Sequence, residues 1–106
     1  MVLKDINPAT EEVIAELPLL EVSEVPAVVS RARTAFLEWS KLGLEERLAI
    51  LAPLPKILRG QEREFSELIT KEMGRPIKEA LASIEKVVQT CEFMLAHGKE
   101  YLTPEI

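Results

Sequence analysis

Residues 76–97 read PIKEALASIEKVVQTCEFMLAH, and this stretch carries the clearest apolar pattern in the chain. Its apolar residues recur at steps of three and four, the spacing that places side chains on one face of a helix. They are Ile77, Ala80, Leu81, Ile84, Val87, Val88, Cys91 and Leu95. Proline suits the first turn of a helix, where no backbone N–H is needed, so Pro76 marks the start. The pattern predicts a helix over 76–97 and a mainly α fold.

Three helical stretches precede this one, and the two nearest to it are described first. Residues 61–73 repeat the spacing and predict a helix with four apolar side chains turned inward: Phe65, Leu68, Ile69 and Met73. Residues 44–59 predict another, with Leu48, Leu51 and Leu54 on one side. Pro53 and Pro55 interrupt it, and each removes a helical hydrogen bond and clashes with the preceding turn. We therefore expect a kink or break there.

The first predicted helix covers 23–42. Ser23 is placed as its N-cap, with Glu24 in the first turn, where an acid favours the helix dipole. Its apolar face comprises Val25, Val28, Val29, Ala32, Phe36 and Trp39. Phe36 and Trp39 close this face, and we interpret them as core residues rather than as a ring-stacking site.

Residues 1–20 predict a short β-hairpin. Pro8 fixes its own φ and disfavours the helical region for Asn7, so residues 7–10 (NPAT) read as a turn. Residues 13–17 (VIAEL) then predict a strand that Pro18 closes. An isolated hairpin is marginal in water and needs a surface to lie against. The expected fold is one domain over 1–106, a hairpin followed by three to four helices.

Four glycines stand alone, each after a helical stretch: Gly43, Gly60, Gly74 and Gly98. We interpret all four as helix ends at which a left-handed backbone is needed. No two are close enough to build a phosphate-binding loop, so the sequence predicts no cofactor-binding residues.

Composition and charge exclude several classes of protein. The net charge is −5 with scattered basic residues, which argues against nucleic acid or an anionic membrane as partner. The single cysteine, Cys91, excludes an internal disulfide and fits a reducing compartment. We see no signal peptide and no apolar run long enough to span a bilayer, so cytoplasm is the expected location.

The reactive side chains each have a structural interpretation. Cys91 lies late on an apolar helix face, where the dipole opposes a thiolate, and we expect a buried structural cysteine rather than a nucleophile. His97 stands just before Gly98, and we interpret it as a residue at the C-terminal end of the helix, where a positive charge favours the helix dipole. A metal site would need more ligands than this histidine. The acids at 11–12, 45–46 and 62–64 stand near element starts, where they favour the dipole. No catalytic and no metal-binding residue is predicted.

Three stretches, in this order and spacing, resemble the NAD(P)-dependent aldehyde dehydrogenase superfamily. Residues 6–14 (INPATEEVI) are similar to its opening hairpin. Residues 32–39 (ARTAFLEW), followed by Glu46-Arg47, resemble its first helix and the "E-R" that opens the next. Residues 68–77 (LITKEMGRPI) resemble its "L-I-T-x-E-x-G-K-P" connection between helices. The resemblance covers nearly the whole chain and implies the N-terminal part of that fold.

The last helix resembles one branch of that family. Residues 91–94 (CEFM) and 101–105 (YLTPE) are similar to the succinate-semialdehyde dehydrogenases, with their "C-x-Y-Y-A-E" helix and "L-x-P-E" exit. Two features depart from the family pattern. Glu92 stands where a basic residue is usual, and Pro53 and Pro55 interrupt a helix that is normally continuous.

The resemblance implies an oxidation of aldehyde to acid through a catalytic Cys, with hydride transfer to NAD or NADP. A Glu activates the deacylating water, and an Asn and a backbone N–H hold the oxyanion. All of these residues, with the cofactor-binding glycines, lie beyond the part of the family that this chain matches. Cys91 matches a helix position and not the family nucleophile, so no catalytic residue is carried over and the chain is expected to be inactive alone.

Two interpretations stay open for the chain's role. It is a fragment of an aldehyde dehydrogenase, or a stand-alone helical interaction module that descends from that segment. In the family the N-terminal helices pack against the dinucleotide-binding domain, so their apolar faces need the rest of the enzyme or a second copy. We expect a homo-oligomer, most simply a two-fold dimer, with the last helix and the hairpin as contact elements. The aldehyde and the choice between NAD and NADP stay open.

Overall fold

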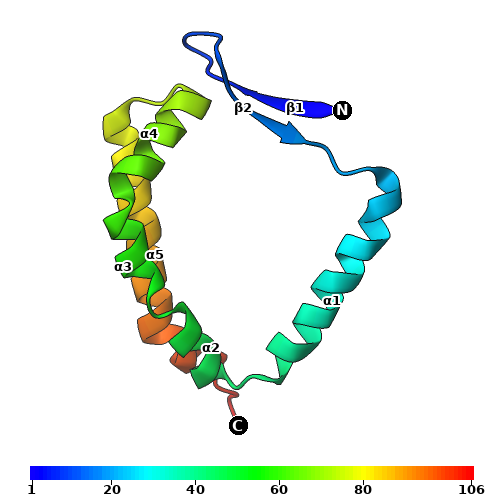
Figure 1. Ribbon diagram of the computed structural model, residues 1–106. Helices are drawn as coiled ribbons and strands as arrows, with labels where there is room; N and C mark the ends of the chain where they lie inside the picture. Colours follow the sequence, from blue (N-terminus) through cyan, green and yellow to red (C-terminus); the bar gives the residue numbers. More distant parts are fainter.

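The computed structural model describes all 106 residues and has two strands followed by helices. Figure 1 shows an open three-sided frame: the hairpin on one side, α1 (Val25–Lys41) on the second, and the remaining helices bundled on the third. The bundle comprises α2 (Leu44–Leu51), α3 (Leu54–Gly60), α4 (Glu62–Met73) and α5 (Ile77–Leu102). The predicted fold class, mainly α with an N-terminal hairpin, is confirmed.

The hairpin joins β1 (Val2–Ile6) and β2 (Val13–Pro18) in antiparallel register, from Val2 opposite Pro18 to Ile6 opposite Val13. Asn7 organises the turn, since its Oδ1 accepts a hydrogen bond from the Ala9 N–H at 2.9 Å. Its carbonyl oxygen accepts a second hydrogen bond from the Glu11 N–H at 2.8 Å. The predicted turn therefore forms where an Asx side chain can replace a backbone partner.

The start of the first helix differs from the prediction. A short 3₁₀ turn over Val22–Glu24 precedes α1, and Ser23 lies inside it rather than capping it. The cap is made by Glu24, whose carboxylate accepts a hydrogen bond from the Glu21 N–H at 2.9 Å. The longer Glu side chain reaches back three residues, as in a capping box, and this contact replaces the expected Ser23 cap.

The predicted break at Pro53 and Pro55 is confirmed. It divides the expected helix 44–59 into α2 and α3. Pro53 is the residue before α3 and Pro55 lies in its first turn, where helical residues need no N–H donor. Pro55 is also one of the few buried residues of the chain, and α3 packs against α5.

Only one of the four glycines ends a helix in the left-handed conformation. Gly74 has φ +67° and closes α4. Gly43 is extended and precedes α2, and Gly60 is the last residue of α3. Gly98 lies inside α5, which continues to Leu102 and not to residue 97 as predicted. The apolar and aromatic residues beyond Gly98 continue the helical spacing, which outweighs the modest cost of one interior glycine.

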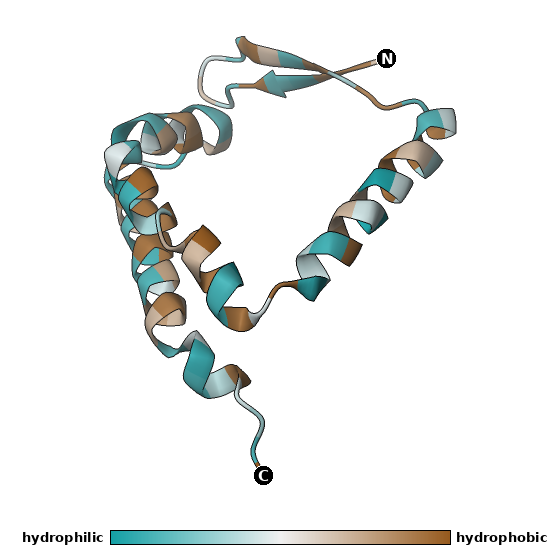
Figure 2. Ribbon diagram, turned by 60° about the horizontal axis from the view of Figure 1, so that its bottom comes forward, coloured by the Kyte–Doolittle hydropathy of each residue, from teal (hydrophilic) through white to brown (hydrophobic).

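The core is small and lies only between α4, α5 and the start of α3. The buried residues are Pro55, Ser66, Ala80, Ile84 and Val88. Phe36 and Trp39, expected in the core, are 58% and 37% exposed. Leu68 and Met73, expected to point inward on α4, are exposed as well. Figure 2 shows hydrophobic and hydrophilic residues alternating along α1, although no other helix packs along it.

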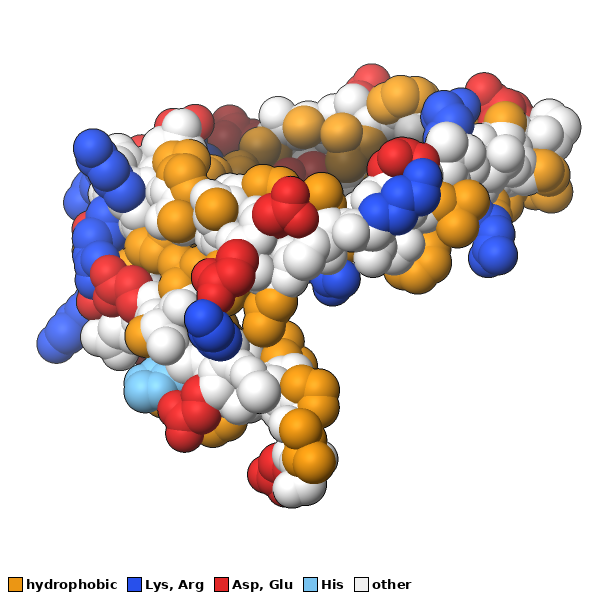
Figure 3. Space-filling view, turned by 90° about the horizontal axis from the view of Figure 1, so that it is seen from below, with side chains coloured by type: hydrophobic (Ala, Val, Ile, Leu, Met, Phe, Trp, Pro, Cys, Tyr) orange, Lys and Arg blue, Asp and Glu red, His pale blue; other side chains and the backbone are white.

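The overall dimensions are larger than those of a compact domain of this length. The radius of gyration is 18.6 Å, against about 13 Å for a compact domain of this length. The accessible surface is 8650 Å², against roughly 6,000 Å² from the scaling of compact proteins. In the view of Figure 3, hydrophobic side chains are spread over the exposed surface of the molecule. None of the helices is long and apolar enough to cross a membrane.

Candidate functional site

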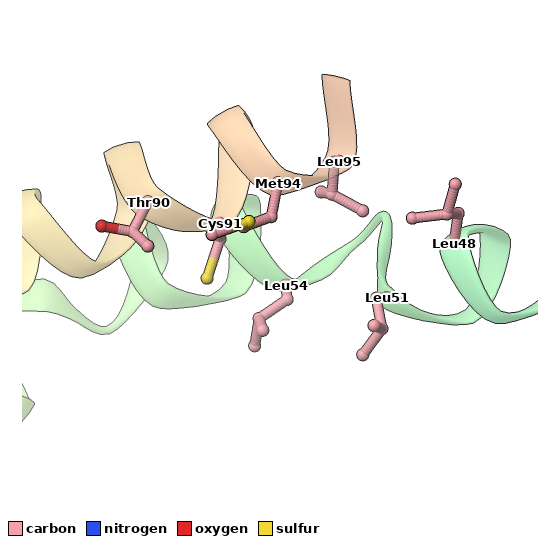
Figure 4. A pocket seen from close by; sticks show the side chains of 7 residues that line it. All are labelled: Leu48, Leu51, Leu54, Thr90, Cys91, Met94 and Leu95. Carbon is pink, nitrogen blue, oxygen red and sulfur yellow. The ribbon is translucent and has the colours of Figure 1, made fainter. Parts of the chain in front are cut away.

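The molecule has two hollows, and the more enclosed and more apolar one is a groove where the helix break faces α5. It has a cavity volume of about 170 Å³ and is almost wholly apolar. The lining residues are Leu48 and Leu51 of α2, Leu54 of α3, and Thr90, Cys91, Met94 and Leu95 of α5. Figure 4 shows Leu48 and Leu95 pointing toward one another, at the end of the groove nearest α2. We call this surface the α2–α5 groove.

The groove follows from the two prolines. The spacing of Leu48, Leu51 and Leu54 places them on one side of a regular helix, but the chain changes course between α2 and α3. The leucines therefore spread along α5 instead of packing in one row (Figure 4). The sequence predicted the break but not the hollow, because its shape depends on the angle between the two halves.

Cys91 is half-buried and not fully buried as predicted. It lines the α2–α5 groove and also a shallower depression with Ser83, Lys86, Val87 and Thr90. The only histidine, His97, does not line either hollow. Cys91 lies in the second half of α5, away from the helix N-terminus, and no histidine or acidic side chain that could act as its general base lines either hollow. The one charged side chain in the linings is Lys86.

His97 lies five residues before the end of α5, so the interpretation that it marks the end of the helix is wrong. Its ring stands 4.6 Å from the Phe93 ring and 6.0 Å from the Tyr101 ring, measured between centroids. Its Nδ1 lies 3.5 Å from a carboxylate oxygen of Glu100. The histidine is thus part of an aromatic row on the last turns of α5, a feature that steps of four from Phe93 to Tyr101 could have indicated.

The acidic pair Glu45 and Glu46 caps the start of α2 and makes an ion pair with α5. Glu46 accepts a hydrogen bond from the Gly43 N–H at 2.7 Å, and Glu45 pairs with Lys99 of α5 at 2.5 Å. The second contact raises the pKa of Lys99, first through its hydrogen bond to Glu45 and then through their opposite charges. No group of three or more histidine, cysteine or acidic side chains is arranged to hold a metal ion.

Arg59 of α3 makes an ion-pair cluster with two acids of α5. It contacts Glu92 closely and Glu85 at 3.3 Å. The hydrogen bond from Arg59, followed by its positive charge, lowers the pKa of Glu92. The hydrogen bond to Glu92 likewise raises the pKa of Arg59. The acid at position 92, which departs from the family pattern, therefore has a partner on the facing helix.

The hairpin approaches the end of α4 near Gly74. A side chain added at Gly74 would meet the ring of Pro8 at 3.2 Å. The pKa of Glu72 is raised, first by loss of hydration and then by its hydrogen bond to Asp5 and the like charge of that residue. Two of the three stretches that resemble the family thus meet in space, which sequence spacing alone does not predict.

The comparisons with known proteins agree with this geometry. The model of the aldehyde dehydrogenase family matches residues 1–106. The Escherichia coli K12 succinate semialdehyde dehydrogenase [NAD(P)+] Sad is 32% identical over 94% of this chain. Malonate-semialdehyde dehydrogenase 1 of Shouchella clausii is 36% identical over 83%. The chain spans only 22% and 18% of these two relatives.

Two solved structures share the fold. A 3,6-anhydro-L-galactose dehydrogenase in complex with NAP superposes with a TM-score of 0.83 and 26% identity, covering 94% of this chain and 21% of that one. The glyceraldehyde-3-phosphate dehydrogenase GapN of Methanocaldococcus jannaschii, complexed with NADP, gives 0.86 at 24% identity and covers 98% and 24%. The chain therefore belongs to the aldehyde dehydrogenase family and corresponds to an N-terminal segment of its members.

Proposed function

We propose that this chain is the N-terminal segment of an enzyme that oxidises an aldehyde to a carboxylic acid with NAD or NADP. We propose further that the chain is not catalytic by itself. The family match over residues 1–106 supports the first half of the proposal. The setting of Cys91 supports the second half, because no histidine or acidic side chain lines either hollow beside this thiol. A cysteine nucleophile is normally activated by a general base beside it.

A short semialdehyde is the proposed substrate class of the whole enzyme. Two relatives are named for succinate semialdehyde and malonate semialdehyde, and both match most of this chain. The resemblance of residues 91–94 and 101–105 to the succinate-semialdehyde branch favours the four-carbon substrate. The substrate pocket itself would lie in the part of the relatives that this chain does not span.

NAD or NADP is the proposed cofactor of the whole enzyme and not of this chain. One structural relative was solved with NAP and another with NADP. Dinucleotide sites use closely spaced glycines at a helix N-terminus, and here the glycines are isolated. The cofactor would therefore contact the rest of the enzyme.

Titration calorimetry of residues 1–106 with NAD and with NADP tests this assignment. We expect no heat of binding and no reduced nicotinamide when succinate semialdehyde is added. A dissociation constant in the micromolar range, or turnover above the rate without protein, would contradict the proposal. Full-length Sad from Escherichia coli is the positive control, since its name assigns it this reaction.

A second candidate function is self-association, as a helical interaction module. The observation that favours it is the surface of 8650 Å², roughly 2,600 Å² above that of a compact chain. A homo-oligomer, most simply a two-fold dimer, would cover part of this excess. Light scattering at micromolar concentration measures the mass and so tests this candidate.

We propose no nucleic-acid or membrane partner, because the net charge is −5. We propose the cytoplasm as the location, because the chain has a single cysteine.

A further inference from the structure

The hairpin meets the helices of its own chain through an acidic side chain. Asp5 is the only residue of β1 that is partly buried, while the apolar residues Leu3 and Ile6 of the same strand are exposed. Charged side chains normally stay in solvent and apolar ones are covered first. The burial of β1 is therefore the reverse of the usual pattern, in the strand that approaches the end of α4 (Figure 1).

A β-bulge lies next to Asp5. Asp5 pairs with Ala15 and Ile6 pairs with Val13, so β2 has one extra residue, Ile14, between these two pairs. A bulge bends a strand and changes the direction of the side chains beside it. Ile14 is also the only partly buried residue of β2. Both partly covered residues of the two strands thus lie at the bulge.

The side chain that meets Asp5 is another acid, Glu72. It lies in the last turn of α4, and its carboxyl group makes a hydrogen bond with that of Asp5. Two residues further along, a Cβ added to Gly74 would meet the ring of Pro8 at 3.2 Å. One polar and one steric contact therefore join the hairpin to the same end of α4.

A hydrogen bond between two carboxyl groups needs a proton on one of them. An ionised carboxylate only accepts hydrogen bonds, whereas a protonated carboxyl group donates one. Two carboxylates at this contact would repel each other, so one of them binds a proton more tightly. The contact between Asp5 and Glu72 is thus made by the form that holds one shared proton.

No basic side chain of the hairpin takes the place of this proton. Lys4 is next to Asp5, but successive side chains of a strand point to opposite faces. Lys4 instead pairs with Glu16 across the hairpin at 3.7 Å. Glu11 and Glu12, in the turn, add only negative charge.

The helix side supplies no cation either. Arg75 follows the end of α4 and lies 3.8 Å from the carboxylate of Glu79 on α5. Lys71 is the residue before Glu72, about 100° away around the helix. Asp5 is the only charged side chain that shifts the pKa of Glu72.

We propose that the contact between the hairpin and α4 is held by one proton shared between Asp5 and Glu72, so that the hairpin docks in acid and its docking weakens as the pH rises. The proposal concerns residues of one chain and does not depend on the enzyme to which the chain contributes.

The direction of the pH dependence follows from Glu72. Its pKa is raised in the folded chain, first by loss of hydration and then by the hydrogen bond to Asp5 and the like charge of that residue. A group with a raised pKa contributes its stability below its ordinary pKa and loses it as the pH rises through the raised value. Across that window the docking constant falls by up to about tenfold for each pH unit.

Nuclear magnetic resonance of residues 1–106, titrated from acid to neutral pH, measures the proton and the docking together. The carboxyl carbon shifts of Asp5 and Glu72 report the proton. The nuclear Overhauser effect between the Pro8 ring and the α-protons of Gly74 reports the docking. We expect Glu72 to titrate above the ordinary value of glutamate, and the Pro8–Gly74 signal to weaken over the same pH range. A chelator in the buffer excludes a divalent cation that could replace the proton.

Glu72→Gln and Asp5→Asn separate the proton from the contact. Each amide keeps the shape of the carboxyl group and donates a hydrogen bond to the remaining carboxylate without a titrating proton. We expect the Pro8–Gly74 signal of both variants to persist at neutral pH, at the strength that the native chain shows in acid. Glu64→Gln removes the same charge from an exposed position on α4 and should behave like the native chain. Circular dichroism checks that all variants keep their helicity.

Three results would overturn the proposal. If Asp5 and Glu72 each titrate at the ordinary value of their residue type, they share no proton. If the Pro8–Gly74 signal of the native chain is the same at every pH, or absent at every pH, the docking is not linked to a proton. If Glu64→Gln removes the pH dependence as completely as Glu72→Gln does, the effect comes from the overall charge and not from this pair.

Discussion

At the residue scale, Ser66 is the least expected member of the core. It is fully buried on α4, and its hydroxyl has no hydrogen-bond partner. Two other fully buried residues, Ala80 and Val88, belong to α5, the helix that α4 packs against. Small side chains let two helices approach closely, so the size of Ser66 explains its position better than its polarity does. The spacing of apolar residues does not indicate that Ser66 is buried, because a polar residue is not part of that pattern.

Replacing Ser66 by Ala should stabilise the chain. The change removes a buried hydroxyl without a partner and keeps the close approach of α4 and α5. Such an unpartnered group costs about 1–3 kcal/mol, so we expect the free energy of unfolding to rise by about 1 kcal/mol in urea titrations. Ser66→Val is the contrasting variant and should be less stable, because it adds volume in a tight contact. A loss of stability in Ser66→Ala would show that the hydroxyl has a partner.

The Arg59–Glu92 pair predicts a pH dependence. The pKa of Glu92 is lowered in the folded chain, so its contribution is present above the ordinary pKa of glutamate and is lost as pH falls through the lowered value. Glu92→Gln should therefore be less stable than the native chain at neutral pH, and the difference should vanish in strong acid. Thermal unfolding from neutral to acidic pH measures this.

Glu64→Gln is the matched control for Glu92→Gln, since it removes the same charge from an exposed position on α4. Equal stability of Glu92→Gln and the native chain at neutral pH would mean that the pair contributes nothing. Both side chains are almost half exposed, so solvent screening keeps the effect small.

At the scale of elements, the sequence predicted what local chemistry decides and missed what packing decides. Pro53 and Pro55 gave the helix break, and the NPAT turn gave the hairpin, because each acts on its own backbone. Gly98 was misread as a helix end, because the helical spacing continues past it. Phe36 and Trp39 were expected in the core because periodicity identifies an apolar face but not its partner.

Restoring a continuous helix tests the origin of the groove. In the double variant Pro53→Ala/Pro55→Ala, the missing N–H donors return, and each proline costs roughly 3 kcal/mol in a helix interior. We expect α2 and α3 to join, with more helical signal in circular dichroism. Pro104→Ala, in the tail beyond α5, is the control. Unchanged helicity would mean that other contacts impose the break.

The approach of the hairpin to α4 is tested at Gly74. Its φ of +67° disfavours any residue with a Cβ, and an added Cβ would meet Pro8 at 3.2 Å. We expect Gly74→Ala to lose about 1–2 kcal/mol from the left-handed conformation alone, and to loosen the hairpin. Gly60→Ala is the control, since nothing lies within 4 Å of the Cβ position there. Hydrogen exchange of the hairpin amides reports the contact, and unchanged protection in Gly74→Ala would contradict it.

At the scale of the whole molecule, the open shape and the family match explain one another. The hairpin, α1 and the helix bundle all carry exposed apolar side chains, yet only five residues of the chain are buried. A chain that matches about a fifth of its relatives' length presents the surfaces that the rest of such an enzyme would cover. Composition alone did not show this, because 47% hydrophobic residues is ordinary for a closed domain.

The most direct measurement of the central claim is complementation of a relative. Escherichia coli Sad, from which the first segment matching this chain has been removed, is coexpressed with residues 1–106 and assayed for reduced nicotinamide with succinate semialdehyde. The account predicts activity that neither part shows alone, because the two parts re-form the contacts of one fold. The excised segment of Sad is the positive control. Activity with that segment but none with this chain would contradict the claim that the chain works as the N-terminal segment of such an enzyme.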